Sequence, residues 1–467
     1  MRRSLVALLL LFVLGGCGQP ATPIAAPGGA PAAAPLGAPI TGGIDSSHRS
    51  GPTQAYGSTI DHVVVIVQEN RSTDNLFNGL PGANTVKYGY NSHGQYIQLQ
   101  SDPLTGPYDM LHTHSDYQTD YARGNMNGFN LAKSKCVEAY WKCPQAGMRA
   151  YSYVPESDVQ AYFDMAEQYA FADEMFETNQ GPSFPAHQYL VSGTSTVSDG
   201  SSLRASENPK TPGGQGTGGC DSPRGTLGQL INSYGREDQY AFPCFDRTAI
   251  TDLIDKRGLS WHYYQENKGP GLWNGLDAIK HLWQNRTEYN ENVITPSSRV
   301  LTDISDGYLA NVTWITPSGK ASDHAGETNG SGPSWVASIV DEIGTSSFWN
   351  STVIIVTWDD WGGWYDHVAP KQYNSYELGM RVPMIVISPY AKRGYVSHVP
   401  YEFGSILKYI ETTFTLGSMG TTDVRANNIS DMFDLRSRPR VFKPIKAKYG
   451  AKYFLAQPPT GKPPDDD

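Results

Sequence analysis

Residues 63–67 form the feature that most constrains the fold, because they are an unbroken run of apolar, β-branched side chains. A strand that is apolar on both faces is typical of the interior of a parallel sheet covered by helices. Sheets of this kind bind ligands at the carboxyl ends of their strands. Here that end carries Glu69, Asn70 and Arg71. A carboxylate beside an amide oxygen suits a hard cation, although an ordinary polar turn before a helix also explains the pattern.

The rest of the chain alternates between predicted strands and helices, as a doubly wound sheet requires. We expect further strands at 169–176, 259–264, 311–316, 352–357 and 382–388, and helices at 155–169, 248–257, 334–343 and 401–414. Two stretches lack such periodicity: residues 78–150, which we expect to form long loops around the site, and a Gly/Pro-rich insertion at 196–245. The predicted fold is therefore α/β, a mostly parallel sheet with helices on both faces and long loop insertions.

The N-terminus has the pattern of an export signal. Arg2 and Arg3 precede an apolar run, residues 5–14, that is too short for a membrane-spanning helix. Leu14-Gly15-Gly16-Cys17 resembles a bacterial lipobox, in which Cys17 becomes the lipidated N-terminus; an ordinary signal peptide is the alternative. We therefore expect an extracytoplasmic lipoprotein, at the cell surface or in the periplasm, held to the membrane by its lipid. Export through either the Sec or the twin-arginine route fits this pattern.

The same pattern sets the predicted domain organisation. Residues 1–17 are the signal with its lipobox, and residues 18–57, mostly Ala, Pro and Gly, form a flexible tether. Residues 58–456 are expected to form a single domain, with residues 457–467 as a disordered tail.

Cysteine usage agrees with export. Without Cys17 four cysteines remain, an even number that suits disulfides in an oxidising compartment. Three pairings are possible, and proximity along the chain favours Cys136–Cys143 and Cys220–Cys244. A zinc site fits less well, because neither pair has the two-residue spacing of zinc knuckles.

The charge balance limits the class of partner. The formal net charge is −10, from 36 basic and 46 acidic residues. Nucleic-acid binding requires a basic surface that neutralises phosphates, so this balance argues against a nucleic acid as partner. A bound divalent cation could still attract an anionic substrate locally. The sequence leaves the oligomeric state open.

Two further strand ends carry reactive side chains. Ser183 stands at a predicted helix start, where free backbone N–H groups and the helix dipole stabilise an alkoxide or a phosphate; a plain helix cap is the alternative. Asp359 and Asp360 directly follow the buried strand at 352–357. Adjacent carboxylates repel each other unless a cation neutralises them. Together with Glu69-Asn70, these residues predict a serine nucleophile activated by a metal ion.

These segments make the chain similar to a bacterial family of phosphoesterases that contains acid phosphatases and phosphatidylcholine-type phospholipases C. The family is a branch of the alkaline-phosphatase superfamily, and the resemblance runs from about residue 60 to 420. It rests chiefly on three motifs: Val67-Gln68-Glu69-Asn70-Arg71-Ser72, Gly181-Pro182-Ser183-Phe184-Pro185 and Trp358-Asp359-Asp360-Trp361-Gly362-Gly363-Trp364-Tyr365-Asp366-His367-Val368. It implies an alkaline-phosphatase-like fold and hydrolysis of a phosphate ester, either a monoester or a phospholipase C-type diester.

The resemblance also implies a role for individual residues. One divalent metal ion would be held by Glu69, Asn70, Asp359 and Asp360. Ser183 would be a further ligand and the nucleophile that forms a phosphoseryl intermediate. His114 and His324 would contact phosphate oxygens or protonate the leaving group, whereas His262 and His367 are interpreted as structural. The oxygen ligands suit Ca²⁺, Mg²⁺ or Mn²⁺, and Zn²⁺ is a further possibility because related sites use it.

Two departures from the family pattern leave alternatives open. Many members have Thr where this chain has Ser183, and Asn-Arg where it has Ala186-His187. Residues 183–187 also nearly match the sulfatase signature, Ser or Cys-x-Pro-x-Arg, but His187 replaces the required Arg. One alternative is therefore a sulfatase-like hydrolase of the same fold. The other is a catalytically silent surface lipoprotein that binds an anionic ligand, which the survival of every expected catalytic position argues against.

Overall fold

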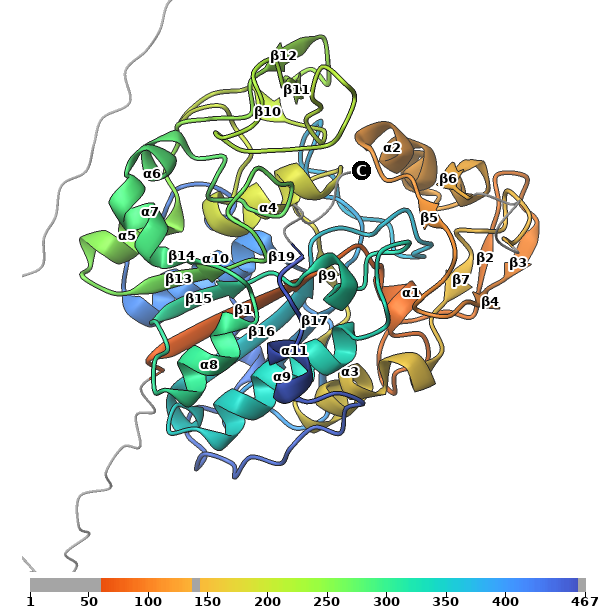
Figure 1. The fold of residues 1–467 in the computed structure, drawn as a ribbon. Coiled ribbons are helices and arrows are strands. Elements are labelled where there is room, and N and C mark those ends of the chain that lie inside the picture. The colour runs from red at the N-terminus through yellow and green to blue at the C-terminus, as the bar shows by residue number, and fades with distance from the viewer. Residues whose placement is uncertain (1–59, 137–142, 461–467) are drawn as a thin grey trace, which may run out of the picture. The chain divides into compact units, whose positions relative to one another are not determined.

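The computed structural model describes residues 60–136 and 143–460, which centre on one large sheet (Figure 1). Its eight strands follow the order β14-β13-β15-β1-β16-β17-β8-β18. β1 (His62–Gln68) lies inside the sheet, parallel to β15 (Val312–Ile315) on one side and to β16 (Thr352–Trp358) on the other. Residues 63–67 are at most 1% exposed. The prediction of a strand buried on both faces is confirmed.

Seven of the eight strands point the same way. The parallel set continues with β13 (Trp261–Tyr264), β14 (Val293–Ile294), β8 (Ala170–Ala172) and β18 (Tyr395–Ser397). The exception is β17 (Met384–Ile387), which is antiparallel to both of its neighbours. A parallel strand needs a crossover, usually through a helix; the described chain from β16 to β17 contains no helix. The mostly parallel α/β sheet is thus confirmed, with one reversed strand.

Helices cover the sheet in two groups (Figure 1). In one group, α9 (Gly332–Thr345) packs against α3 (Glu156–Gln168), α8 (Arg299–Ser305) and α11 (Ala451–Leu455). In the other, α4 (Ser183–Ser192) packs against α5 (Ile250–Lys256) and α10 (Phe403–Phe414). The four predicted helices correspond to α3, α5, α9 and α10. Short helices complete the set: α1 (Thr73–Leu76), α2 (His114–Tyr121), α6 (Lys280–Gln284) and α7 (Arg286–Asn292).

The predicted strand at 169–176 is in fact two short strands. β8 belongs to the main sheet, whereas β9 (Met175–Phe176) pairs with β19 (Tyr401–Glu402). Asp173 stands at the break, where its carboxylate accepts hydrogen bonds from the Asn84 N–H at 2.7 Å and from the His398 ring at 2.9 Å. These side-chain bonds draw the chain out of the sheet before it reaches Ser183.

The two stretches without periodicity form small sheets and loops. The first contains β2 (Tyr88–Tyr90) paired with β3 (Tyr96–Gln98), β4 (Gln100–Ser101) with β7 (Ser152–Tyr153), and β5 (Asp109–Met110) with β6 (Ser134–Lys135). The second forms a sheet of β10 (Arg204–Ala205), β11 (Gly228–Ile231) and β12 (Gln239–Ala241). Both predicted disulfides, Cys136–Cys143 and Cys220–Cys244, are present. Each closes a loop within these stretches.

The predicted signal, Cys17 and the tether lie outside the described residues. The predicted tail is described as far as Thr460, whose N–H donates to Glu266 Oε1 at 2.8 Å. Across the described part of the chain, no helix combines the length and the apolar character that crossing a membrane would require.

Candidate active site

The site is built where β1 and β16 end. These strands are parallel and in register, so the residues that follow them, Glu69-Asn70 and Asp359-Asp360, emerge side by side. The Asp359 N–H donates to the Gln68 carbonyl at 3.0 Å, and the Asn70 N–H donates to Asp359 Oδ1 at 3.1 Å. All four side chains are at most 1% exposed. Asn70 has a φ of 56°, a left-handed conformation that Asn tolerates better than most residues.

Ser183 approaches the same edge from α4, of which it is the first residue. Its Oγ donates to Asp360 Oδ2 at 3.3 Å, and its side chain is fully buried. Gly181 makes the approach possible, because a Cβ at that position would stand 2.8 Å from the Ser206 carbonyl oxygen. The hydroxyl therefore lies at a helix N-terminus and faces a carboxylate.

His187 lies one turn further along α4, on the same face as Ser183. Its Nε2 is 2.9 Å from Glu69 Oε1 and 3.8 Å from Asp359 Oδ2. Burial lowers the pKa of His187 to about 4, against the opposing pull of Asp359, so the imidazole is neutral. The sequence analysis gave His187 no role in the site. The four-residue spacing from Ser183 was the signal that could have identified it.

His112 is a second histidine that the sequence analysis did not select. Its Nε2 is 3.0 Å from the Asn70 amide nitrogen and 3.8 Å from Asp360 Oδ2, and its Nδ1 bonds to the Met110 carbonyl at 2.9 Å. Its ring lies 6.3 Å from that of His324, which was predicted. His112 and His324 therefore stand together beside the carboxylates.

The other predicted histidine, His114, points elsewhere. Its ring bonds to Glu237 Oε1 at 3.0 Å and to the Gln118 amide at 3.1 Å. Thr113 caps α2, which makes His114 the first helical residue and leaves His112 in the extended segment before it. A capping box of Thr113 with Asp116 was the sequence signal that separates the two histidines.

Three buried carboxylates meet here without a lysine or arginine partner for the aspartates. In the described chain, the ion pairs of Asp359 and Asp360 are to His187 and His112 alone. Burial, together with the charge of Asp359, raises the pKa of Asp360 well above its ordinary value. Such a cluster is stable only if it takes up protons or a cation.

The Asn70 amide can adopt two orientations, which differ in whether a cation is needed between the facing oxygens. In one, its oxygen faces Glu69 Oε2 at 3.0 Å and Asp359 Oδ1 at 3.1 Å, while its nitrogen faces His112. In the other, the nitrogen donates to both carboxylates and the oxygen accepts from His112. Three oxygens that face one another fit a shared cation. The second orientation gives Glu69 Oε2 and Asp359 Oδ1 a donor without a cation, but Asp359 Oδ2 still has no hydrogen-bond partner among the described residues.

A cavity of about 600 Å³ opens beside this cluster. Its lining includes His112, Pro182, Lys135, Lys210, Glu207 and Tyr240. Tyr240 belongs to β12, so the insertion at 196–245 forms one wall of the cavity. Lysines in this position favour an anionic ligand.

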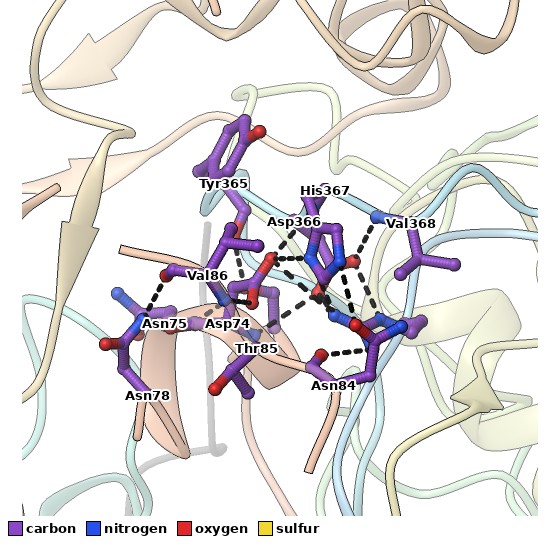
Figure 2. Close-up of polar contacts among 12 residues, drawn as sticks. Asp74, Asn75, Asn78, Asn84, Thr85, Val86, Tyr365, Asp366, His367 and Val368 are labelled. Atoms are coloured by element: carbon purple, nitrogen blue, oxygen red, sulfur yellow. Dashed lines mark hydrogen bonds and ion pairs between the residues drawn. The ribbon is translucent and has the colours of Figure 1, made fainter. Parts of the chain in front are cut away.

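A second acidic cluster lies close by along the same two segments (Figure 2). Asp74 and Asp366 share Arg381, whose Nε donates to Asp366 Oδ1 at 2.8 Å and whose Nη2 is 3.6 Å from Asp74 Oδ2. His367 also bonds to Asp74 Oδ2, at 2.6 Å. A cation of the chain already neutralises this pair. The His367 ring contacts the side chains of Asp74 and Asn84, and its interpretation as a structural histidine stays a prediction.

A hydroxyl at a helix N-terminus that faces buried carboxylates and histidines is an arrangement typical of hydrolases. The chain belongs to the Phosphoesterase family, whose family model matches residues 60–417. It is therefore a hydrolase that acts on phosphate esters, and the resemblance deduced from the motifs is confirmed.

Individual proteins that the chain is similar to include two phospholipases C and one solved structure. Phospholipase C A of Mycobacterium tuberculosis is 25% identical over 457 residues, covering 86% of this chain and 82% of the relative. Non-hemolytic phospholipase C of Pseudomonas aeruginosa is 24% identical, covering 76% of this chain and 54% of the relative. Among solved structures, a protein of the alkaline phosphatase superfamily from Vibrio parahaemolyticus is 10% identical with a TM-score of 0.34, covering 81% of this chain and 73% of that one.

Proposed function

We propose that the chain hydrolyses phosphate esters with Ser183 as nucleophile, in a centre that holds one divalent cation. Its ligands would be Glu69, Asn70, Ser183, Asp359 and Asp360. The observation that carries the proposal is the convergence of Ser183 Oγ, 3.3 Å from Asp360 Oδ2, with three buried carboxylates at one sheet edge. When bound, the cation would supply charge neutralisation for the phosphate and acidify the serine hydroxyl.

The other steps of the reaction are assigned to side chains around Ser183. Asp360 Oδ2 accepts the hydrogen bond of the Ser183 hydroxyl and so aims its lone pair at the incoming phosphorus. The positive end of the α4 helix dipole favours negative charge beside Ser183, although Pro182 and Pro185 have no N–H and the Phe184 N–H donates to Asn208 Oδ1 at 2.9 Å. His112 and His324 stand where they could protonate the leaving alcohol, and their placement supports His112 over His114 in this role. A water molecule would then hydrolyse the phosphoseryl intermediate.

The substrate would be a phosphomonoester or a phospholipase C-type phosphodiester. The names of the relatives favour the diester. The cavity that His112 and Pro182 line leaves room for a second ester group. Hydrolysis of p-nitrophenyl phosphate, bis(p-nitrophenyl) phosphate and phosphatidylcholine, with the metal varied, separates these classes. Turnover of an aryl sulfate alone would favour the sulfatase alternative, and no turnover at all would favour a silent binding protein.

Replacement of the nucleophile tests the mechanism directly. Ser183→Ala should lower kcat/KM by on the order of 10⁴-fold. Ser192→Ala is the matched control, because Ser192 is equally buried at the other end of α4. Trapping of phosphate on Ser183 by rapid acid quench and peptide mass spectrometry identifies the intermediate. A Ser183→Ala enzyme that keeps a tenth of the wild-type rate excludes the assignment.

We also propose that the enzyme works outside the cytoplasm on a lipid anchor at Cys17. The two disulfides support an oxidising compartment. Mass spectrometry of the mature N-terminus should find acylated Cys17, and Cys17→Ala should release the protein from membranes. An unmodified N-terminus elsewhere would favour the ordinary signal peptide.

A further inference from the structure

The proposed set of oxygen ligands gives no role to His187, although this histidine lies in the same centre. It is fully buried on the face of α4 that carries Ser183, and its imidazole points at two carboxylates of the proposed metal site. This inference rests on the proposed function, because it concerns the same cation. It adds a ligand and a class of metal that the oxygen ligands alone do not give.

Three of the four distances between polar atoms around the centre are close to those of a coordination sphere, and the fourth, from His187 to Asp359, is longer. Glu69 Oε1 is 2.9 Å from His187 Nε2, and Glu69 Oε2 is 3.0 Å from the Asn70 amide oxygen position. That position is 3.1 Å from Asp359 Oδ1, and Asp359 Oδ2 is 3.8 Å from His187 Nε2. These contacts form a ring of polar atoms that begins and ends at the His187 imidazole. Ligand atoms bound at about 2.1 Å in neighbouring positions stand roughly 3.0–3.4 Å apart.

A hydrogen bond from His187 to Glu69 alone leaves part of this arrangement unexplained. Asp359 Oδ2 is buried and has no hydrogen-bond partner among the described residues. A buried carboxylate oxygen without a partner is costly. A cation that contacts His187, Glu69 and Asp359 together satisfies this oxygen as well as the imidazole nitrogen.

We propose that His187 Nε2 is a ligand of the cation, and that the centre therefore selects a transition-metal ion such as Zn²⁺, Mn²⁺ or Fe²⁺ over Ca²⁺ and Mg²⁺. Imidazole nitrogen binds such ions well, whereas Ca²⁺ and Mg²⁺ prefer sites made only of oxygen.

The test uses metal-free full-length protein titrated with Zn²⁺, Mn²⁺, Mg²⁺ and Ca²⁺. His187→Gln retains an N–H that can donate to Glu69 but lacks the imidazole lone pair. It should weaken Zn²⁺ binding by on the order of 100-fold and change Mg²⁺ and Ca²⁺ affinities by less than about threefold. His281→Gln is the matched control, because His281 is 40% exposed and pairs with Asp246 and Asp252 instead.

A spectroscopic readout keeps the proposal falsifiable if the variant does not fold. Electron spin-echo spectra of the Mn²⁺-loaded wild type should show modulation from a directly bound histidine ¹⁴N, and His187→Gln should lose it. Absence of this signal in the wild type, or an equal loss of affinity for all four ions in the variant, overturns the proposal. His187 would then position Glu69 without binding the metal ion. A wild type that binds no divalent ion overturns the proposed function itself.

Discussion

Two acidic clusters, built on the same two chain segments, differ in where their positive charge comes from. Asp74 and Asp366 share the guanidinium of Arg381 and further donors from the chain (Figure 2). Among the described residues, the ion pairs of Asp359 and Asp360 are to His187 and His112, with no arginine or lysine. Burial raises the carboxyl pKa in both clusters, but Arg381 opposes that effect at Asp366, whereas Asp359 adds to it at Asp360. The first cluster therefore has a cation supplied by the chain, and the second is the one for which we propose a bound metal ion.

The contrast explains why a geometric group of possible metal ligands is not enough to define a metal site. Asp74, Asp366 and His367 lie close enough together to hold an ion, as do Glu69, His187 and Asp359. In the first group, the position of a cation is taken by Arg381. What distinguishes the second is that its aspartates pair with histidines and, among the described residues, with no arginine or lysine; the number of acidic residues does not distinguish the two groups.

The largest expected effect comes from Asp360→Asn. It removes a proposed metal ligand and the acceptor of the Ser183 hydroxyl, so kcat/KM should fall by on the order of 10³-fold or more. The free energy of unfolding of the metal-free protein should stay the same or rise, because repulsion with Asp359 is relieved. Kinetics and calorimetry in chelator measure the two effects. Asp303→Asn, which removes a carboxylate that pairs with Arg299, is the control; equal activity in both variants would contradict the metal site.

The neighbouring cluster should respond in the opposite way. Arg381→Met leaves Asp74 and Asp366 buried without their cation, and the free energy of unfolding should fall by about 3–5 kcal/mol. Arg299→Met is the control, because its guanidinium side chain is 59% exposed and its pair with Asp303 should contribute under about 1 kcal/mol. Urea titrations of both variants measure the difference. If Arg381→Met is no less stable than Arg299→Met, the two clusters do not differ as we infer.

Metal removal should affect one cluster only. A ligand at about 100 times its Kd stabilises the folded state by about 2.7 kcal/mol, so the wild type should lose that amount, and its activity, in chelator. Added metal should restore both. In Asp360→Asn the Tm should hardly respond to chelator, whereas Arg381→Met should respond as the wild type does. An equal response of Tm in wild type and Asp360→Asn would place the ion elsewhere.

The sequence was sufficient to predict the sheet and three of the strand ends that build the site. Runs such as residues 63–67 identify buried parallel strands, and the carboxyl ends of parallel strands meet at one edge. This rule brought Glu69-Asn70 and Asp359-Asp360 together before any coordinates. The disulfides followed from proximity along the chain. The apolar pattern of β17 did not show that it is antiparallel to its neighbours, because strand direction depends on the path of the chain that connects two strands.

Contacts made across long stretches of chain were beyond sequence reasoning. Asp360 and Asp366 look alike, as acidic residues in one aromatic and glycine-rich loop. Only the fold shows that Arg381 reaches Asp366 and that no arginine or lysine pairs with Asp360 among the described residues. The sequence likewise did not point to His112, whereas the role predicted for His114 stays a prediction. Two histidines two residues apart diverge because Thr113 starts a helix between them.

The smallest expected effect is a pH dependence within the Arg381 cluster. Burial lowers the pKa of His367, but its bond and ion pair with Asp74 outweigh this and raise the pKa above its ordinary value. A group whose pKa is raised on folding stabilises the protein fully below its unfolded pKa, about 6.5 for histidine. That stability is lost as the pH rises through the folded pKa. As the pH rises above about 6.5, the wild type should therefore lose more stability than His367→Gln. Urea titrations in chelator, at a series of pH values, give the free energy of unfolding of each protein. The difference between the wild type and His367→Gln removes the contribution of the other titrating groups, which the two proteins share. Parallel curves would show that His367 is neutral in the folded protein, and that Arg381 alone neutralises Asp74 and Asp366.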